Sequence, residues 1–178
     1  MFQYIFNSYP FEYLYNLLTK IFYSPQPLIT NYAHNEKKKT PNDNLKNFYY
    51  LSLIKEPNSE SNYTIHGLWP QTDIKNYPTY CKKVNFDMDQ LTPILDKLEQ
   101  YWYSNKHTLI MDEKFWKHEY EKHGSCVYTP MTEFEYFNNT INLYEKALEK
   151  NLPSKFYNSQ KNQCLIPVDQ SLNFIELN

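Results

Sequence analysis

Two stretches of the sequence decide its interpretation: residues 64–70, which read TIHGLWP, and residues 115–126, which read FWKHEYEKHGSC. The second stretch has no helix breaker before Gly124. On a helix, Glu119, Lys122 and His123 stand at i, i+3 and i+4, so a carboxylate, an ammonium and an imidazole share one face. An imidazole moves protons near neutral pH, and a fixed cation offsets charge that builds on phosphorus. The pattern therefore predicts phosphoryl-transfer chemistry, with a second histidine as acid–base partner.

The same residues allow plainer interpretations. Glu119 and Lys122 could form a surface ion pair, with His123 as a cation that favours the helix C-terminus. A zinc protease motif is excluded, because His118-Glu119 is followed by Lys122 where H-E-x-x-H requires histidine. The three cysteines show neither C-x-x-C pairs nor Cys/His spacing, so no structural metal is expected.

Charge limits how nucleic acid could be held. The formal net charge is −2, with 18 basic and 20 acidic residues. Binding over a broad basic surface needs clustered Lys or Arg, which this balance does not favour. Any RNA is therefore expected to be gripped locally, in a cleft.

The two stretches resemble, almost residue for residue, the two active-site signatures of the ribonuclease T2 family. These have the forms I-H-G-L-W-P and F-W-x-H-E-(aromatic)-x-K-H-G-(S/T)-C, and both occur here in order. The resemblance covers roughly residues 48–177. It implies a metal-independent endoribonuclease, without cofactor, that cleaves single-stranded RNA through a 2′,3′-cyclic phosphate to 3′-phosphate ends. The alternative is a ribonuclease-like binding or signalling protein that acts without turnover.

The resemblance also implies a role for each matching residue. His123 would take the proton of the ribose 2′-hydroxyl and His66 would protonate the leaving 5′-oxygen, so DNA would not be cleaved. Glu119 and Lys122 would stabilise the transition state. The phosphate would be bound by His118 and Trp69, and the bases by Trp69, Gln71, Tyr77 and Phe115. For Tyr77 and Phe115, ordinary aromatic packing is an equally open interpretation. A monomer is expected.

The three cysteines indicate the kind of cellular compartment in which the protein is located. The resemblance pairs Cys81 with Cys126, whereas the family partner of Cys164 would lie at or just beyond Asn178. Two interpretations stay open: a shortened C-terminus, or a Cys164 that is a free or intermolecular thiol. A stable disulfide implies an oxidising compartment, and the family is mostly secreted, vacuolar or lysosomal. Residues 1–25 are apolar but interrupted by Pro10 and Glu12, which makes a poor signal peptide. The location, secreted or endomembrane lumen, therefore stays open.

A chain of 178 residues predicts one domain, and its strands and helices mix without regular β–α alternation. We expect an α+β fold with a central antiparallel sheet packed with several helices. An N-terminal extension, residues 1–46, would carry an amphipathic helix and a loop, and residues 47–178 would form the catalytic domain. The predicted strands are 48–53, 62–68 and 172–177.

Three helices are predicted in the catalytic domain. The first covers residues 91–103 and begins at Thr92 and Pro93. The second covers residues 114–123 and ends at Gly124 as a left-handed cap. The third covers residues 132–150, with a Thr132–Glu135 capping box and an apolar face of Phe134, Phe137, Ile141, Tyr144 and Leu148.

Overall fold

The computed structural model describes residues 45–56, 62–104 and 108–176. These residues belong to one compact unit, Lys39–Asn178. The N-terminal extension expected over residues 1–46, with its amphipathic helix and loop, lies outside the described residues except for its last two residues. Within the described ranges, no helix has both the length and the apolar character that crossing a bilayer requires.

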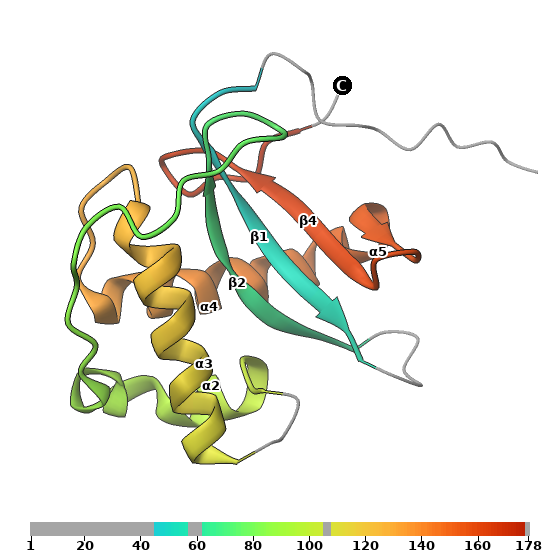
Figure 1. Cartoon of the computed structure of the whole chain (residues 1–178). Coiled ribbons are helices and arrows are strands. Elements are labelled where there is room, and N and C mark those ends of the chain that lie inside the picture. The colour runs from blue at the N-terminus through green and yellow to red at the C-terminus, as the bar shows by residue number, and fades with distance from the viewer. Residues whose placement is uncertain (1–44, 57–61, 105–107, 177–178) are drawn as a thin grey trace, which may run out of the picture. The chain divides into compact units, whose positions relative to one another are not determined.

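A four-stranded antiparallel sheet with the order β2-β1-β4-β3 forms the centre of this unit. Its strands are β1 (Phe48–Lys55), β2 (Tyr63–Gln71), β3 (Tyr157–Asn158) and β4 (Gln163–Val168). The helical elements are η1 (Met88–Ile94), α2 (Leu95–Tyr101), α3 (Leu109–Lys122), η2 (Gly124–Cys126), α4 (Glu133–Glu149) and α5 (Leu152–Phe156). The predicted α+β class is confirmed. Figure 1 shows α4 crossing one face of the sheet and α3 standing beside the β2 edge.

The core lies between the sheet and these helices. β1 is buried from Phe48 to Leu53 because it pairs with a neighbour on each side. Trp102 and Trp116 are fully buried, as are Tyr136 and Phe137 of α4. Large aromatic side chains therefore fill the space between α3, α4 and β2, and this packing holds the two signature stretches together.

β2 is an edge strand of the sheet, and four of its carbonyl oxygens accept hydrogen bonds from aromatic side chains. The Tyr144 hydroxyl donates to the Tyr63 carbonyl, and the Tyr136 hydroxyl donates to the Leu68 carbonyl. The Tyr128 hydroxyl donates to the Gln71 carbonyl, and the Trp102 indole N–H donates to the His66 carbonyl. An edge strand otherwise presents unpaired backbone N–H and C=O groups. These bonds fix β2, the strand that carries the first signature, against the helices.

The first predicted helix begins earlier than expected and in a different form. Asp87, rather than Thr92, is the N-cap, and its side chain accepts from the Asp89 N–H. The chain then forms a 3-10 helix through residue 94 before α2 begins. Pro93 lies within this stretch. It lacks the N–H that an α-helix needs there, which accounts for the late start of α2.

Gly124 does not end α3 as a left-handed cap. It lies in η2, and no described glycine has a positive φ. Its smallness is used instead for a close approach, since a Cβ on Gly124 would come within 2.4 Å of the Tyr120 ring. The prediction of where α3 ends was correct, but the reason was wrong.

Two further predictions differ at the C-terminal end. Residues 172–176 contain only an isolated bridge from Phe174 to Val168, whereas the last strand is β4, which pairs with β1. The α4 helix and its capping box are confirmed. Leu148, however, is 39% exposed, because the buried face is centred on Tyr136, Thr140, Leu143 and Ala147.

Candidate active site

His66 is set apart from its strand by a β-bulge. Ser52 of β1 pairs with Gly67 and Leu53 pairs with Ile65, so His66 has no partner across the ladder. Bulges re-aim a side chain, and they leave the extra residue's backbone free for other bonds. The His66 carbonyl accepts from the Trp102 indole N–H at 3.0 Å, and the Trp102 carbonyl accepts from the Trp116 indole. Two buried indoles therefore fix the backbone that carries this imidazole.

Gly67 makes room for the next contact. The Trp69 indole N–H donates to Glu119 Oε2 at 2.9 Å, which links β2 to α3. A Cβ on Gly67 would lie 2.4 Å from Glu119 Oε2 and 2.6 Å from Trp69 Nε1. The contact between indole and carboxylate thus passes directly over Gly67, where no side chain fits.

The two signature histidines both pack against the Trp69 ring. The centroid of Trp69 lies 4.9 Å from that of His66, edge to face, and 5.2 Å from that of His123, stacked. Both Nδ1 atoms are buried, and neither has a hydrogen-bond partner within the described part of the chain. Buried nitrogens without partners are rare in packing cores. This pair therefore favours a site built for proton transfer.

The C-terminal turn of α3 supplies the rest of the cluster. Glu119 and His123 are buried, at 2% and 3% exposure, whereas Lys122 is half-buried. A surface ion pair between Glu119 and Lys122 is not formed: within the described residues, the ion contact of Glu119 is to His66, with 3.8 Å between Oε1 and Nε2. The ammonium of Lys122 is in no ion pair with described residues, so it is available to an anion.

Burial controls the protonation of this cluster. Burial, followed by the positive charges of Lys122 and His118, lowers the pKa of His66 to about 4. The pKa of His123 is lowered to about 3 by burial and by Lys122, His66 and His118. Burial raises the pKa of Glu119 to about 7, although the Trp69 hydrogen bond and Lys122 oppose it. Between about pH 4 and 7, His66 and Glu119 therefore meet as neutral groups rather than as an ion pair.

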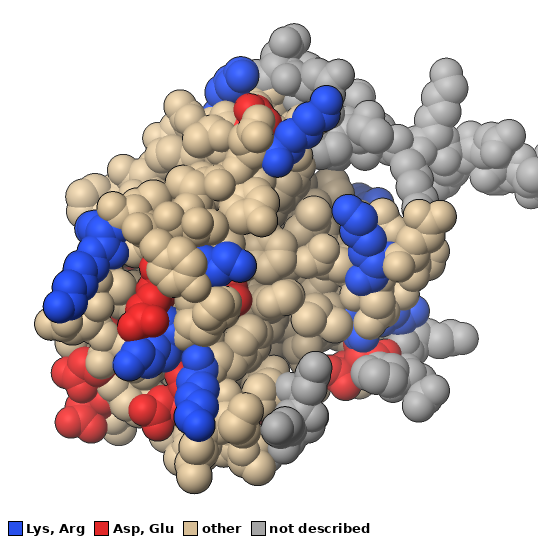
Figure 2. Space-filling view, viewed as in Figure 1, with Lys and Arg blue, Asp and Glu red and all other residues tan. Residues whose placement is uncertain are grey.

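Three other predicted residues surround the pair. The ring of Phe115 lies 5.6 Å from that of His66, and the exposed ring of Tyr77 lies 6.3 Å from that of His123. His118 is exposed, and it lines an open cleft of about 750 Å³ together with His66 and Phe115. On the face in Figure 2, lysines are scattered among acidic residues around an uncharged centre. The cleft thus opens on the His66 side of the site, and His123, Lys122 and Trp69 do not line it.

Gln71 is placed differently. Its side chain is buried, and its amide donates to the carbonyls of Trp69 at 3.3 Å and Pro70 at 3.0 Å. The structure does not bring this amide to the open side of the site. The Trp69 N–H is likewise already donated to Glu119.

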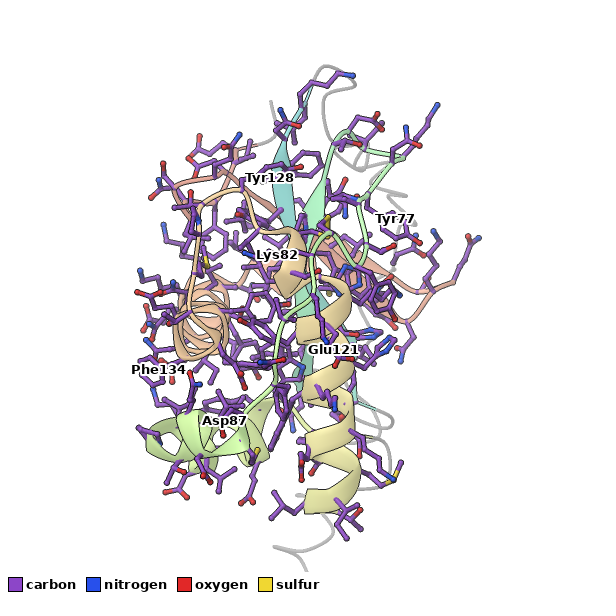
Figure 3. The ribbon with its side chains drawn as sticks, turned by 60° about the vertical axis from the view of Figure 1, so that its left-hand side comes forward. Tyr77, Lys82, Asp87, Glu121, Tyr128 and Phe134 are labelled. Carbon is purple, nitrogen blue, oxygen red and sulfur yellow. A yellow bond between two sulfur atoms is a disulfide. The ribbon has the colours of Figure 1, made fainter. Side chains whose placement is uncertain are left out.

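The structure contains the disulfide Cys81–Cys126, across a sequence separation of 45 residues. It joins the loop after β2 to η2, directly beyond His123. The Cys81 N–H also donates to Ser125 Oγ at 3.0 Å. Figure 3 shows this loop, marked by Tyr77 and Lys82, passing the end of α3 near Glu121. Cys164 is a free, buried thiol on β4.

Sequence reasoning missed two features of the site. The bulge at His66 and its bond to Trp102 join residues 36 positions apart, and no local pattern indicates them. The close approach at Gly67 had one signal, because the chain has only two glycines and both follow a signature histidine.

Comparison with known proteins places the sequence and the fold in one family. The sequence model of the ribonuclease T2 family matches residues 34–169. The chain belongs to the ribonuclease T2 family. Its described fold matches that of a solved ribonuclease-related protein from Calystegia sepium, with a TM-score of 0.55 and 20% identity, over 74% of this chain and 91% of that one.

Curated relatives carry ribonuclease names. Ribonuclease 1 of Arabidopsis thaliana is 34% identical over 95 residues, which make up 51% of this chain and 41% of the relative. Ribonuclease DdI of Dictyostelium discoideum is 37% identical over 84 residues, or 46% of this chain and 36% of the relative. The chain thus spans less than half the length of these two family members.

Proposed function

We propose that this protein is an endoribonuclease that cleaves single-stranded RNA by transphosphorylation. One observation carries the proposal: the imidazoles of both signatures pack against the same Trp69 indole, with centroids 4.9 Å and 5.2 Å away, and Glu119 lies 3.8 Å from His66. Two imidazoles at one phosphodiester supply a base and an acid, each worth about 10²–10⁴-fold in rate. A half-buried ammonium adds charge stabilisation.

In the proposed reaction, neutral His123 removes the proton of the ribose 2′-hydroxyl, and the 2′-oxygen attacks phosphorus. Protonated His66 gives its proton to the 5′-oxygen as that bond breaks, which leaves a 2′,3′-cyclic phosphate. Water then opens the cyclic ester to a 3′-phosphate, with the two histidines in exchanged roles. Each proton taken by one imidazole is matched by one given by the other.

Glu119, Lys122 and His118 act on the phosphoryl oxygens. Below about pH 7, Glu119 is protonated. Because its Oε2 accepts from Trp69, its Oε1 is the oxygen that carries the proton and donates to the substrate. Lys122 provides positive charge, and exposed His118 holds the phosphate. Trp69 is a second phosphate contact only if its N–H leaves Glu119. The chemistry uses these side chains and needs no metal or cofactor.

Bases would be held by aromatic faces, as in other readers of single strands. Tyr77 and Phe115 border the two histidines and supply such faces, beside Trp69. Gln71 is a base contact only if its amide leaves the strand carbonyls it now binds. DNA would not be cleaved, because it lacks the attacking hydroxyl, and the protein would work as a monomer.

We place the activity in residues 47–178, with residues 1–46 as an accessory segment. Removal of residues 1–40 should then leave RNA cleavage intact. The disulfide supports a secreted or endomembrane location, because such bonds persist in oxidising compartments.

The test incubates the protein with single-stranded RNA in excess EDTA and looks for ends in 2′,3′-cyclic phosphate. His66→Ala and His123→Ala should each slow cleavage at least about 100-fold. His34→Ala is the matched control, because His34 belongs to neither signature. If the folded, disulfide-bonded protein leaves RNA intact at acidic and neutral pH, a ribonuclease-like binding protein is the better description.

A further inference from the structure

Tyr80 has a backbone conformation that its side chain does not favour. Five described residues other than glycine have a positive φ, and three of them are asparagine, which tolerates this region. The two exceptions are Tyr80, with φ 51°, and Leu172, with φ 63°. A bulky residue in this region is disfavoured and needs a compensating gain.

Packing accounts for Leu172 but not for Tyr80. Leu172 is half-buried and packs against the hydrophobic core. Tyr80 is 57% exposed. Within the described residues, Tyr80 and Tyr77 are the two aromatic side chains that are largely exposed, although the chain holds 18 tyrosines. Both lie on one loop at the site, so the exposure is confined to one place.

The position of Tyr80 is fixed from two sides. Its N–H donates to the Lys122 carbonyl at 2.9 Å, at the end of α3. The next residue, Cys81, is bonded to Cys126. The Tyr80 backbone is therefore anchored to the end of α3, and its ring lies edge to face with the His118 ring at a centroid distance of 6.5 Å.

We infer that Tyr80 forms a stacking subsite for an unpaired nucleobase outside the dinucleotide that is cleaved. The inference rests on the proposed binding of single-stranded RNA. Tyr77 and Phe115 adjoin His123 and His66, the positions suited to the two bases at the scissile bond. Tyr80 adjoins His118 instead, so the strand that continues from the scissile phosphate at His118 passes the Tyr80 ring beyond these two base positions. An exposed ring on an anchored backbone suits any base, because every base has a face to stack.

The test measures binding of 2′-O-methyl RNA, which cannot be cleaved, to the full chain by fluorescence anisotropy. Dinucleotide and hexanucleotide probes are compared for wild type, Tyr80→Asn and Tyr80→Phe, with Leu172→Asn as the matched control. Tyr80→Asn should raise the Kd for the hexanucleotide about tenfold, since it removes one stacked base. Tyr80→Phe should bind as wild type does, because the ring remains. Leu172→Asn should leave the Kd unchanged.

Stability separates a functional ring from a structural one. Asparagine suits a positive φ, so Tyr80→Asn should raise Tm by about 2–4 °C. A variant that is more stable and binds less tightly supports the subsite. A lower Tm for Tyr80→Asn would overturn it, as would an unchanged hexanucleotide Kd or a wild type that binds both probes equally. If wild type cleaves RNA but Tyr80→Asn binds the hexanucleotide with an unchanged Kd, the subsite alone is refuted. If wild type does not cleave RNA but Tyr80→Asn binds the hexanucleotide more weakly than wild type, the proposed function alone is refuted.

Discussion

Protonation of two imidazoles sets the pH at which the proposed reaction runs. His66 must be protonated, and its pKa is about 4, so kcat/KM should fall as pH rises above about 4. His123 must be neutral, and its pKa is about 3, so kcat/KM should fall again below about pH 3. The negative phosphodiester favours imidazolium. The falling limb of kcat should therefore lie at higher pH than that of kcat/KM, as rate profiles on a dinucleotide would show.

Lys122 offers the control for this pH prediction. Its charge helps to lower both histidine pKa values, so Lys122→Gln should move both limbs of the profile to higher pH. Lys117→Gln is the matched change, because Lys117 is exposed and adjoins Glu121. A kcat/KM that stays constant from pH 4 to pH 7 in wild type would contradict the assignment of His66 as the acid.

At the scale of elements, the bulge in β2 depends on one indole. Trp102→Phe removes the indole N–H that donates to the His66 carbonyl. Trp116→Phe is the matched change, because it removes an indole of equal size whose N–H donates to the Trp102 carbonyl instead. Each change leaves a carbonyl without its donor, part-buried at His66 and buried at Trp102, which costs about 1–3 kcal/mol in the free energy of unfolding. Trp102→Phe alone should also lower kcat about tenfold, because it releases the backbone of His66.

Urea unfolding gives the stability of both variants, and kcat is measured where each is fully folded. Equal losses of kcat in the two variants would mean that general loosening of the core, rather than the bond at the bulge, lowers activity.

Local signals predicted elements well, whereas contacts between distant residues were not predicted. The capping box located α4 to within one residue, because Thr132 and Glu135 satisfy each other. β4 was missed, because its strand character depends on pairing with β1, more than 100 residues earlier. Likewise, motif identity named His66, Glu119 and His123. It could not show that a β-bulge orients the His66 side chain, or that burial raises the pKa of Glu119 so that it is protonated.

For the whole molecule, the disulfide is the main covalent constraint. Replacing Cys81 and Cys126 by serine opens a loop with a sequence separation of 45 residues, which should cost about 4 kcal/mol in a chain-entropy account. Tm should then fall by about 10 °C. KM for RNA should rise, since the bond fixes the Tyr77 loop to the end of α3. Thermal unfolding and steady-state kinetics measure the two effects.

Reduction of the wild-type protein should reproduce both losses. Cys164→Ala keeps the bridge and removes the buried thiol, so its response to the reductant should match that of wild type. An unchanged Tm in reductant would show that the loop is held by its hydrogen bonds to Ser125 and Lys122 alone.

The chain has three tryptophans, and each indole N–H is donated within the network around the site: to Glu119, to the His66 carbonyl and to the Trp102 carbonyl. The protein therefore contains its own spectroscopic reporters. Its tryptophan emission comes entirely from rings in or next to the catalytic network, and its amide spectrum should hold three indole resonances that respond to events at His66. Occupancy of the site can thus be followed in the unlabelled wild-type chain.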